Sequence, residues 1–433
     1  MNSAPAVGSL SSAPAELPAR RRGKLRVVAG WLLVPVAVLL AVLAGVAAAL
    51  GTAALVPQAP VFLGVGALAV LAVGYGLGRL AGVLVRARYG RRLAVVLALG
   101  TAVGTAAVLA TTVLTPLPAP VGLVGDPRGP GEVWQLPTGS EIVYDRVAAV
   151  GPARATPVLL LHGGPGTPGS GPGSTGDALA AQGFDVYAYD QVGAGRSERL
   201  ADPREYTVAR HVADLEAVRE QIGAEQVVLV GTSWGAVLAA EYLAARPERV
   251  ARVVLLAPGP LYDPARADRD RSDQWDGLSP ERRAAADALL EHPRVIAWSL
   301  LQQVDPRAAH ALVPDAELDG RLTEVLRELA AAGVGTCAPH PAMEYRAGTP
   351  GFYVNQVTAA DLLVRPDPRP ALRDLAVPAL VLRGECDWIA PDVAAEYVDL
   401  LGAAFLEVPG AGHLVRARQP TFVDAALVEF LTR

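Results

Sequence analysis

A serine stands between two glycines in the stretch GTSWG (231–235), which follows a β-rich run and precedes a helical one. In a G-x-S-x-G turn between a strand and a helix, the glycines permit a tight backbone that exposes the serine hydroxyl. The pattern predicts that Ser233 is a nucleophile, with the positive end of the following helix directed at it. The alternative interpretation is that Ser233 only caps that helix.

A serine nucleophile needs a base, and the base needs an acid that orients it. In this arrangement the acid and then the histidine follow the serine along the chain. We expect His413 to be the base, because it is the one histidine after the last predicted strand, in the glycine-rich turn GAGH (410–413). Four others, in a predicted helix and in a predicted insertion, are interpreted as surface or core residues: His211, His292, His310 and His340.

The acid is expected directly after an apolar strand, in the stretch GECD (384–387). We favour Asp387, because Pro391 and the helix after it leave this residue in the loop, whereas Glu385 is still leaving the strand. Glu385 is the competitor, and Asp361 is a more distant third candidate.

The oxyanion of a tetrahedral intermediate is stabilised by preorganised N–H donors. One donor is expected from Trp234, the residue after the nucleophile. The other is expected from Gly163 or Gly164 in the loop HGGPG (162–166), where glycines let the backbone approach a substrate oxygen. Taken alone, this loop would be interpreted as an ordinary turn, but the order of the motifs along the chain favours an oxyanion hole.

From Trp134 onward, short apolar runs alternate with helical ones, which is typical of a mainly parallel sheet covered by helices on both faces. Strands are predicted at VWQLP, 141–150, 157–163, 184–190, 226–232, 251–258, 378–384 and 404–410. Helices are predicted at 207–222, 235–246, 392–401 and 420–432. The prediction is an α/β core over 126–258 and 371–433, with a helical insertion, 259–370, that forms a lid over the site.

Five motifs together resemble the proline iminopeptidase branch of the α/β-hydrolases: HGGPG (162–166), DQVGAGRS (190–197), GTSWGA (231–236), GECDWIAP (384–391) and GAGH (410–413). The resemblance covers about residues 130–433. It implies an α/β-hydrolase fold with a triad of Ser233, Asp387 and His413, and oxyanion N–H groups from Gly164 and Trp234. It also implies release of N-terminal residues, often proline, from peptides. Relatives of this family include other aminopeptidases, amidases and esterases.

Two features depart from the family pattern. The last glycine of the family's GxSWGG motif is Ala236, a small change that the turn should tolerate. The lid glutamates with which the family binds a substrate's free amino group are not matched by any motif. Glu344 is our candidate for that role among five glutamates of the predicted lid: Glu291, Glu317, Glu324, Glu328 and Glu344.

These motifs favour a serine hydrolase that works through an acyl-enzyme, most specifically an aminopeptidase. An esterase or amidase with the same triad is the alternative, and a requirement for a free α-amino group would distinguish the two. A third hypothesis is a membrane-tethered binding protein that has lost catalysis, which the intact triad and oxyanion loop disfavour. Dehalogenases and epoxide hydrolases of this fold carry an aspartate where this chain has Ser233, so their chemistry is not expected.

The preceding part of the chain contains three long apolar stretches, at about 27–55, 61–84 and 93–116. A helix crosses a bilayer with roughly 20 apolar residues, so each stretch is long enough. We predict a membrane domain over 27–118 that follows a disordered basic N-terminus, 1–26. The first stretch is too long for a signal peptide, and uncharged runs of this length disfavour three buried helices of a soluble bundle.

Ten basic residues precede position 93, on either side of the first two spans, whereas the loop that joins those spans is uncharged. Because positive loops stay in the cytoplasm, we expect a multi-pass protein of the cell membrane with a cytoplasmic N-terminus and an extracytoplasmic hydrolase domain. The spans contain no acid and one arginine, Arg79, near an end, so we interpret them as an anchor in the lipid bilayer.

The rest of the chain is acidic and its arginines are scattered, so nucleic-acid binding is not expected. No CxxC motif or histidine cluster has ligand spacing, so we expect neither a metal nor another cofactor. Cys337 and Cys386 are the only cysteines. They could pair in an oxidising exterior, but we favour two free thiols because Cys386 lies beside the predicted acid.

Overall fold

The structure is a computed structural model that describes residues 19–85, 88–118, 126, 128–262, 278–345, 347–373 and 375–433. The predicted disordered segment up to residue 18, Arg86 of the basic loop and positions 263–277 of the predicted lid therefore lie outside the described residues. The chain divides into two compact units, Met1–Thr115 and Pro116–Arg433.

The first unit contains three long helices, α1 (Ala19–Ala53), α2 (Ala59–Leu84) and α3 (Gly90–Thr112). Each has a stretch long and apolar enough to cross a membrane. Small residues allow close packing within this unit: a side chain on Gly66 of α2 would come within 2.9 Å of the Gly45 carbonyl oxygen of α1. Large apolar side chains such as Leu32 and Leu68 remain exposed, and a lipid environment would cover them.

The second unit is built on a sheet of eight strands in the order β1-β2-β4-β3-β5-β6-β7-β8. The first two strands are antiparallel to their neighbours and the others are parallel, which confirms the predicted mainly parallel sheet. The strands are β1 (Glu132–Gln135), β2 (Glu141–Val147), β3 (Val158–Leu161), β4 (Val186–Tyr189), β5 (Val227–Thr232), β6 (Val250–Leu256), β7 (Ala379–Gly384) and β8 (Ala404–Val408).

Successive residues of the central strands face opposite sides of the sheet, as a period of two requires. Val158 and Leu160 of β3 belong to a buried cluster with Leu179 of α4 (Gly173–Ala180) and Leu427 of α15 (Pro420–Thr432). Leu159, between them in sequence, is fully buried on the other face. Burial on both faces is the physical reason why these strands are apolar at every position.

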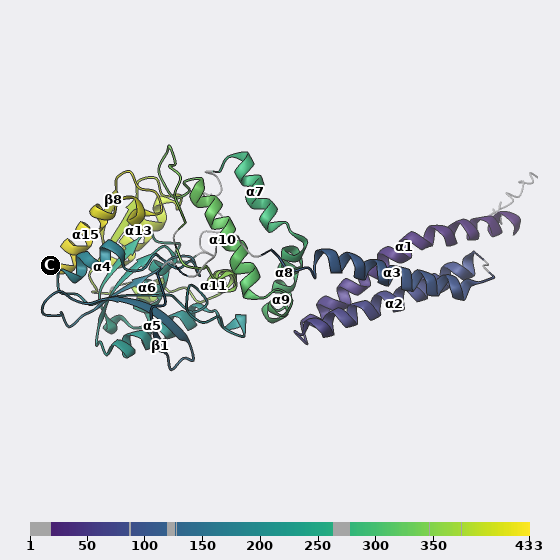
Figure 1. Ribbon diagram of the computed structural model, residues 1–433, viewed down its shortest axis with the longest axis horizontal. Coiled ribbons are helices and arrows are strands. Elements are labelled where there is room, and N and C mark those ends of the chain that lie inside the picture. The colour runs from purple at the N-terminus through teal and green to yellow at the C-terminus, as the bar shows by residue number, and fades with distance from the viewer. Residues whose placement is uncertain are drawn as a thin grey trace, which may run out of the picture. The chain divides into compact units, whose positions relative to one another are not determined.

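The remaining helices of the core are α5 (Val208–Ile222), α6 (Trp234–Ala245), α12 (Arg369–Leu372), α13 (Pro391–Leu401) and α14 (Val415–Arg418), with 3₁₀ turns at Pro203–Glu205 and Pro247–Arg249. The lid contains α7 (Pro280–Leu290), α8 (Pro293–Val304), α9 (Pro306–Leu312), α10 (Asp315–Ala331) and α11 (Phe352–Leu362). Figure 1 shows the lid helices, drawn in green, gathered at one end of the sheet. Helix α4 was not predicted, because its first residues continue a glycine- and serine-rich stretch.

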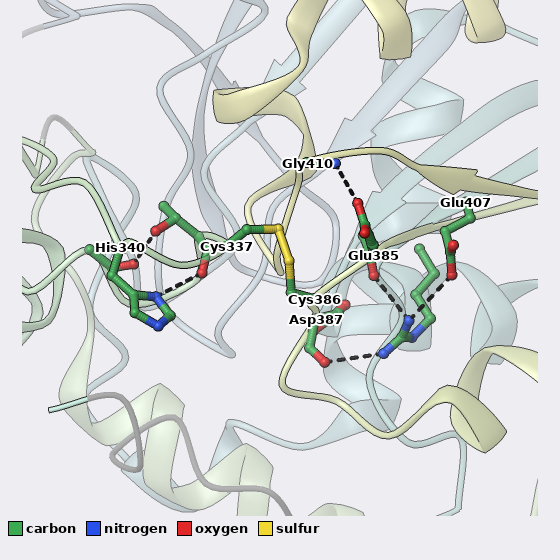
Figure 2. Close-up of a disulfide and its surroundings, with 11 residues drawn as sticks. Cys337, His340, Glu385, Cys386, Asp387, Glu407 and Gly410 are labelled. Carbon is green, nitrogen blue, oxygen red and sulfur yellow. Dashed lines mark hydrogen bonds and ion pairs between the residues drawn. A yellow bond between two sulfur atoms is a disulfide. The ribbon is translucent and has the colours of Figure 1, made fainter.

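The two cysteines form a disulfide with a Cα–Cα distance of 5.4 Å, so the preference for two free thiols is wrong (Figure 2). The lid segment before Cys337 packs directly on the loop that carries His413. Thr336 forms an isolated β-bridge with Ala411, and Leu414 N–H donates to the Gly335 carbonyl at 3.2 Å. Tertiary packing thus brings together two cysteines that are 49 positions apart in sequence.

Candidate active site

Ser233 lies at the junction of β5 and α6 with φ 54° and ψ −116°, a left-handed conformation that non-glycine residues rarely adopt. Its N–H donates to the Leu256 carbonyl at 2.9 Å. A side chain on Gly231 would overlap the backbone of Gly235, and one on Gly235 would overlap the Leu161 carbonyl oxygen. The Ser233 side chain makes no capping hydrogen bond to α6, contrary to the alternative interpretation.

Asp387 and His413 come together from two loops at the carboxyl ends of β7 and β8. His413 Nδ1 lies 2.9 Å from Asp387 Oδ1, and both side chains are buried. The same carboxylate oxygen accepts a hydrogen bond from Ile389 N–H at 3.0 Å. A carboxylate is only an acceptor, so Nδ1 carries the proton and Nε2 is left as the basic nitrogen. The Trp388 ring lies over the imidazole with a centroid distance of 4.2 Å and an interplanar angle of 31°.

The competing acids are occupied elsewhere. Glu385 accepts a hydrogen bond from Gly410 N–H at 2.9 Å and is exposed (Figure 2). Asp361 accepts one from Val208 N–H at 2.8 Å, at the start of α5. Within the described residues, neither of them contacts His413.

The loop HGGPG is held by a buried network of hydrogen bonds. His162 Nε2 accepts from Gln191 N–H at 2.9 Å, so its Nδ1 carries the proton and donates to the Gly163 carbonyl at 2.9 Å. Gln191 also binds the His162 carbonyl at 3.0 Å and accepts from Trp234 Nε1 at 2.8 Å. Burial lowers the pKa of His162, which keeps this imidazole neutral in a positioning role.

The two glycines of this loop lie close to the elbow. A Cβ on Gly163 would come within 3.3 Å of the Ser233 Cβ, so a side chain at this position would crowd the serine. Gly164 has φ +117°, and among the described residues its N–H has no hydrogen-bond acceptor. Trp234 is the first residue of α6, where helical N–H groups have no partner within the helix. Unbound donors of this kind are what an oxyanion requires.

Ser233 and His413 both line a cavity of about 1290 Å³. Gly163 and Gly164 are also part of its wall, and the lid contributes mostly apolar side chains from α8 and α10. Val325, Leu329 and Val334 form a lid cluster that packs against Trp388. The lid therefore touches the aromatic ring that covers His413.

Glu344 lines the same cavity and is exposed in its wall. Three other lid glutamates form salt bridges: Glu317 with Arg294 at 2.7 Å, Glu324 with Arg321 at 2.8 Å, and Glu328 with Arg282 at 3.2 Å. Glu291, the fifth, is exposed and is not part of the cavity wall.

The other histidines have structural partners. Burial lowers the pKa of His211 to about 3, and its Nε2 lies 3.3 Å from the Thr358 hydroxyl. His292 caps α8, His310 pairs with Asp315, and His340 binds the Thr336 carbonyl. In the described parts of the chain, no group of three His, Cys, Asp or Glu side chains could hold a metal ion.

Three residues near the site were not predicted individually from the sequence. Gln191 lies in the DQVGAGRS motif, which was the signal for it. Trp388 stands in the acid motif, beside Asp387. Asn355 of α11 holds the oxyanion loop by donating to the Pro165 carbonyl at 2.8 Å, and no sequence pattern marks it.

Comparisons with known proteins agree with this architecture. A family model described as the alpha/beta hydrolase fold matches residues 156–299. Proline iminopeptidase of Lactobacillus delbrueckii subsp. bulgaricus is 29% identical over 299 residues, which cover 64% of this chain and 90% of that protein. Epoxide hydrolase A of Mycobacterium tuberculosis is 31% identical over 320 residues, which cover 66% of this chain and 94% of that protein. The chain belongs to the α/β-hydrolase family.

A solved structure of proline iminopeptidase from Mycobacterium smegmatis is 23% identical and covers 70% of this chain and 98% of that one, with a TM-score of 0.44. The enol-lactonase from Burkholderia xenovorans is 21% identical and covers 70% of this chain and 100% of that one, with a TM-score of 0.44.

Proposed function

We propose that this hydrolase is a membrane-anchored serine aminopeptidase of the proline iminopeptidase type, with a catalytic triad of Ser233, Asp387 and His413. The observation that carries the proposal is the buried 2.9 Å contact between Asp387 and His413, beside a cavity whose wall contains the strained Ser233. A buried acid–imidazole pair whose imidazole shares a cavity with the serine can activate that serine as a nucleophile.

In this mechanism Ser233 Oγ attacks the substrate carbonyl while His413 Nε2 accepts the hydroxyl proton. The N–H groups of Gly164 and Trp234 stabilise the oxyanion that forms. His413 then donates the proton to the leaving amine, and a water activated by the same imidazole releases the acyl group. Asp387 remains ionised and stabilises the imidazolium through Nδ1–H.

An aminopeptidase must also bind the ammonium group of its substrate. Glu344 is our candidate because, of the five lid glutamates, it is the one that lines the cavity. The proline iminopeptidase relatives support a peptide substrate. The epoxide hydrolase relative does not lead us to propose epoxide opening, since the carboxylate nucleophile of that chemistry is replaced by Ser233.

An esterase with the same triad is the second candidate. The apolar lining from α8 and α10 supports it, because such a wall suits an acyl chain. The two functions differ in whether cleavage requires a free α-amino group.

The test is an assay of the full chain in detergent on aminoacyl anilides, their N-acetylated forms and short-chain nitrophenyl esters. We expect cleavage of free-amine substrates that acetylation abolishes, and a loss of at least about 10⁴-fold in Ser233→Ala. Glu344→Gln should raise KM for free-amine substrates about 10-fold or more, without a matching loss on esters. Turnover of esters alone would establish the esterase instead.

We also propose that α1, α2 and α3 cross the cell membrane with the N-terminus in the cytoplasm and the hydrolase unit outside. The disulfide supports an oxidising compartment for the hydrolase unit, and the placement of the basic residues supports the orientation. Protease added to intact cells should degrade the hydrolase unit while a cytoplasmic marker stays intact. Protection of the unit until the cells are lysed would overturn this topology.

A further inference from the structure

Arg416 lies in α14, three residues after His413, and lines the same cavity. None of the sequence motifs includes Arg416. Among the described residues, the cavity wall contains one other arginine, Arg128. The two arginines differ in how their charges are balanced.

Arg128 is fully engaged by carboxylates. It lies 2.6 Å from Asp126 and 2.5 Å from Asp190, so its guanidinium is neutralised within the wall. Arg416 has no carboxylate in salt-bridge contact among the described residues. Its Nε donates to the Thr175 hydroxyl at 3.1 Å, and one Nη2 proton goes to the Pro172 carbonyl at 3.0 Å.

Among the described residues, Asp424 is connected to Arg416 through this hydroxyl. Thr175 Oγ1 donates to Asp424 Oδ1 at 2.6 Å and accepts from Arg416, so the chain of hydrogen bonds orients the guanidinium. A guanidinium has five N–H donors. Two are used by Thr175 and Pro172, which leaves three, including both protons of Nη1.

Burial lowers the pKa of Arg416, which means that its positive charge is poorly compensated where it stands. A half-buried charge without an opposite partner destabilises the fold unless something else balances it. A carboxylate is the natural complement, since it matches the planar fork of a guanidinium with two parallel hydrogen bonds.

We propose that Arg416 binds a carboxylate of the substrate in the catalytic cavity. This inference rests on the proposed aminopeptidase function and names its substrate class: short peptides whose carboxylate reaches Arg416 while the scissile carbonyl is at Ser233. Glu344 and Arg416 then bind the two charged ends of a zwitterionic peptide. The carboxylate belongs either to the C-terminus or to an acidic side chain next to the cleaved bond.

The experiment compares four substrates that share an N-terminal proline: the anilide, Pro-Ala, Pro-Ala-amide and Pro-Glu-amide. The full-length protein is assayed as wild type, Arg416→Gln and Arg418→Gln. Arg418 is a matched control, because it is an exposed arginine on the same short helix. The wild type should cleave Pro-Ala with a kcat/KM about 10- to 100-fold above that of Pro-Ala-amide.

Arg416→Gln should remove this preference by lowering kcat/KM for the free acid alone, whereas Arg418→Gln should retain it. Preference for Pro-Glu-amide over Pro-Ala-amide would assign the carboxylate to the side chain. An equal loss on all four substrates in Arg416→Gln would overturn the proposal, because it would show that the residue only ties α14 to the Pro172 loop. A wild type that prefers neither Pro-Ala nor Pro-Glu-amide over Pro-Ala-amide would overturn it as well.

If the aminopeptidase proposal is wrong, neither the wild type nor either variant should cleave the anilide, and this result differs from every outcome above. In that case nitrophenyl hemisuccinate and nitrophenyl butyrate, which differ by a terminal carboxylate, test Arg416 separately. A preference for the hemisuccinate that is lost in Arg416→Gln supports the carboxylate site, and equal rates in the wild type overturn it.

Discussion

The sheet core and the lid use their charged residues in different ways. In the core, Asp387 is held by the backbone N–H of Ile389 and the imidazole of His413, and His413 lines the cavity. In the lid, several acids are paired with arginines, as in the partly buried bridges of Glu317 with Arg294 and of Asp319 with Arg199 of the core.

We infer from this difference that the core carries out the reaction and that the lid selects the substrate. The core places Ser233 and the Asp387–His413 pair at the cavity, so it determines which bond chemistry is possible. The lid uses pairs of acids and arginines, such as Glu317 with Arg294, to join its helices. It presents mostly apolar side chains to the cavity, so it determines which substrates fit. The disulfide between Cys337 and Cys386 joins the two regions at the residue before the acid.

The largest effect should come from the core. Asp387→Asn should lower kcat about 10⁴-fold, because an amide no longer fixes the His413 tautomer or stabilises the imidazolium. The measurement is steady-state kinetics on the best substrate. The matched control is Glu385→Gln, two residues earlier, whose carboxylate binds Gly410 N–H. It should stay within about threefold of the wild type, and a comparable loss in both variants would contradict the assignment of the acid.

An intermediate effect should come from the link between the regions. The double variant Cys337→Ser/Cys386→Ser should lose about 2–4 kcal/mol of unfolding free energy in the hydrolase unit, because the bridge restrains a loop of roughly 50 residues in the unfolded chain. Urea unfolding monitored by Trp fluorescence measures this. The variant should also lose activity several-fold, since the lid segment supports the loops of Asp387 and His413.

The control for that variant is the wild type in reducing agent, which should approach the variant, while the variant itself should not respond to the reductant. Identical unfolding midpoints for the wild type and the variant without reductant would mean that the bridge contributes nothing to the stability of the unit.

The smallest effect should come from a charge pair in the lid. The hydrogen bond from His310 to Asp315 raises the pKa of His310. A raised pKa means that this pair stabilises the fold fully at pH values below about 6.5 and that the contribution is lost as the pH rises through the raised pKa. Because both side chains are partly exposed, His310→Gln should cost at most about 1 kcal/mol.

Urea unfolding at pH 5.5 and pH 8.5 tests the sign of this contribution. The difference in unfolding free energy between the wild type and His310→Gln should be larger at pH 5.5 than at pH 8.5. The activity of the two proteins should be the same at both pH values. A larger difference at pH 8.5 would show that the imidazole is neutral in the folded protein.

The sequence by itself determined most of the core. The central strands were predicted because apolar runs buried on both faces of a parallel sheet are visible without alternation. Ser233, Asp387 and His413 could be proposed because each follows a strand in a turn motif, and parallel strands bring their carboxyl ends to one edge. The three long apolar helices were equally visible, since length and absence of charge are local properties.

Only the tertiary structure decided what depends on distant contacts. It paired Cys337 with Cys386 against the prediction, because a lid segment folds back onto the histidine loop. It placed Glu344 in the cavity wall and Glu317 outside that wall, in a bridge with Arg294. It also brought Arg416 into the cavity, with no carboxylate in salt-bridge contact in the part of the chain that the structure describes. The sequence shows where a charged side chain stands in the chain. Its partners lie on other elements, so no local sequence pattern predicts them.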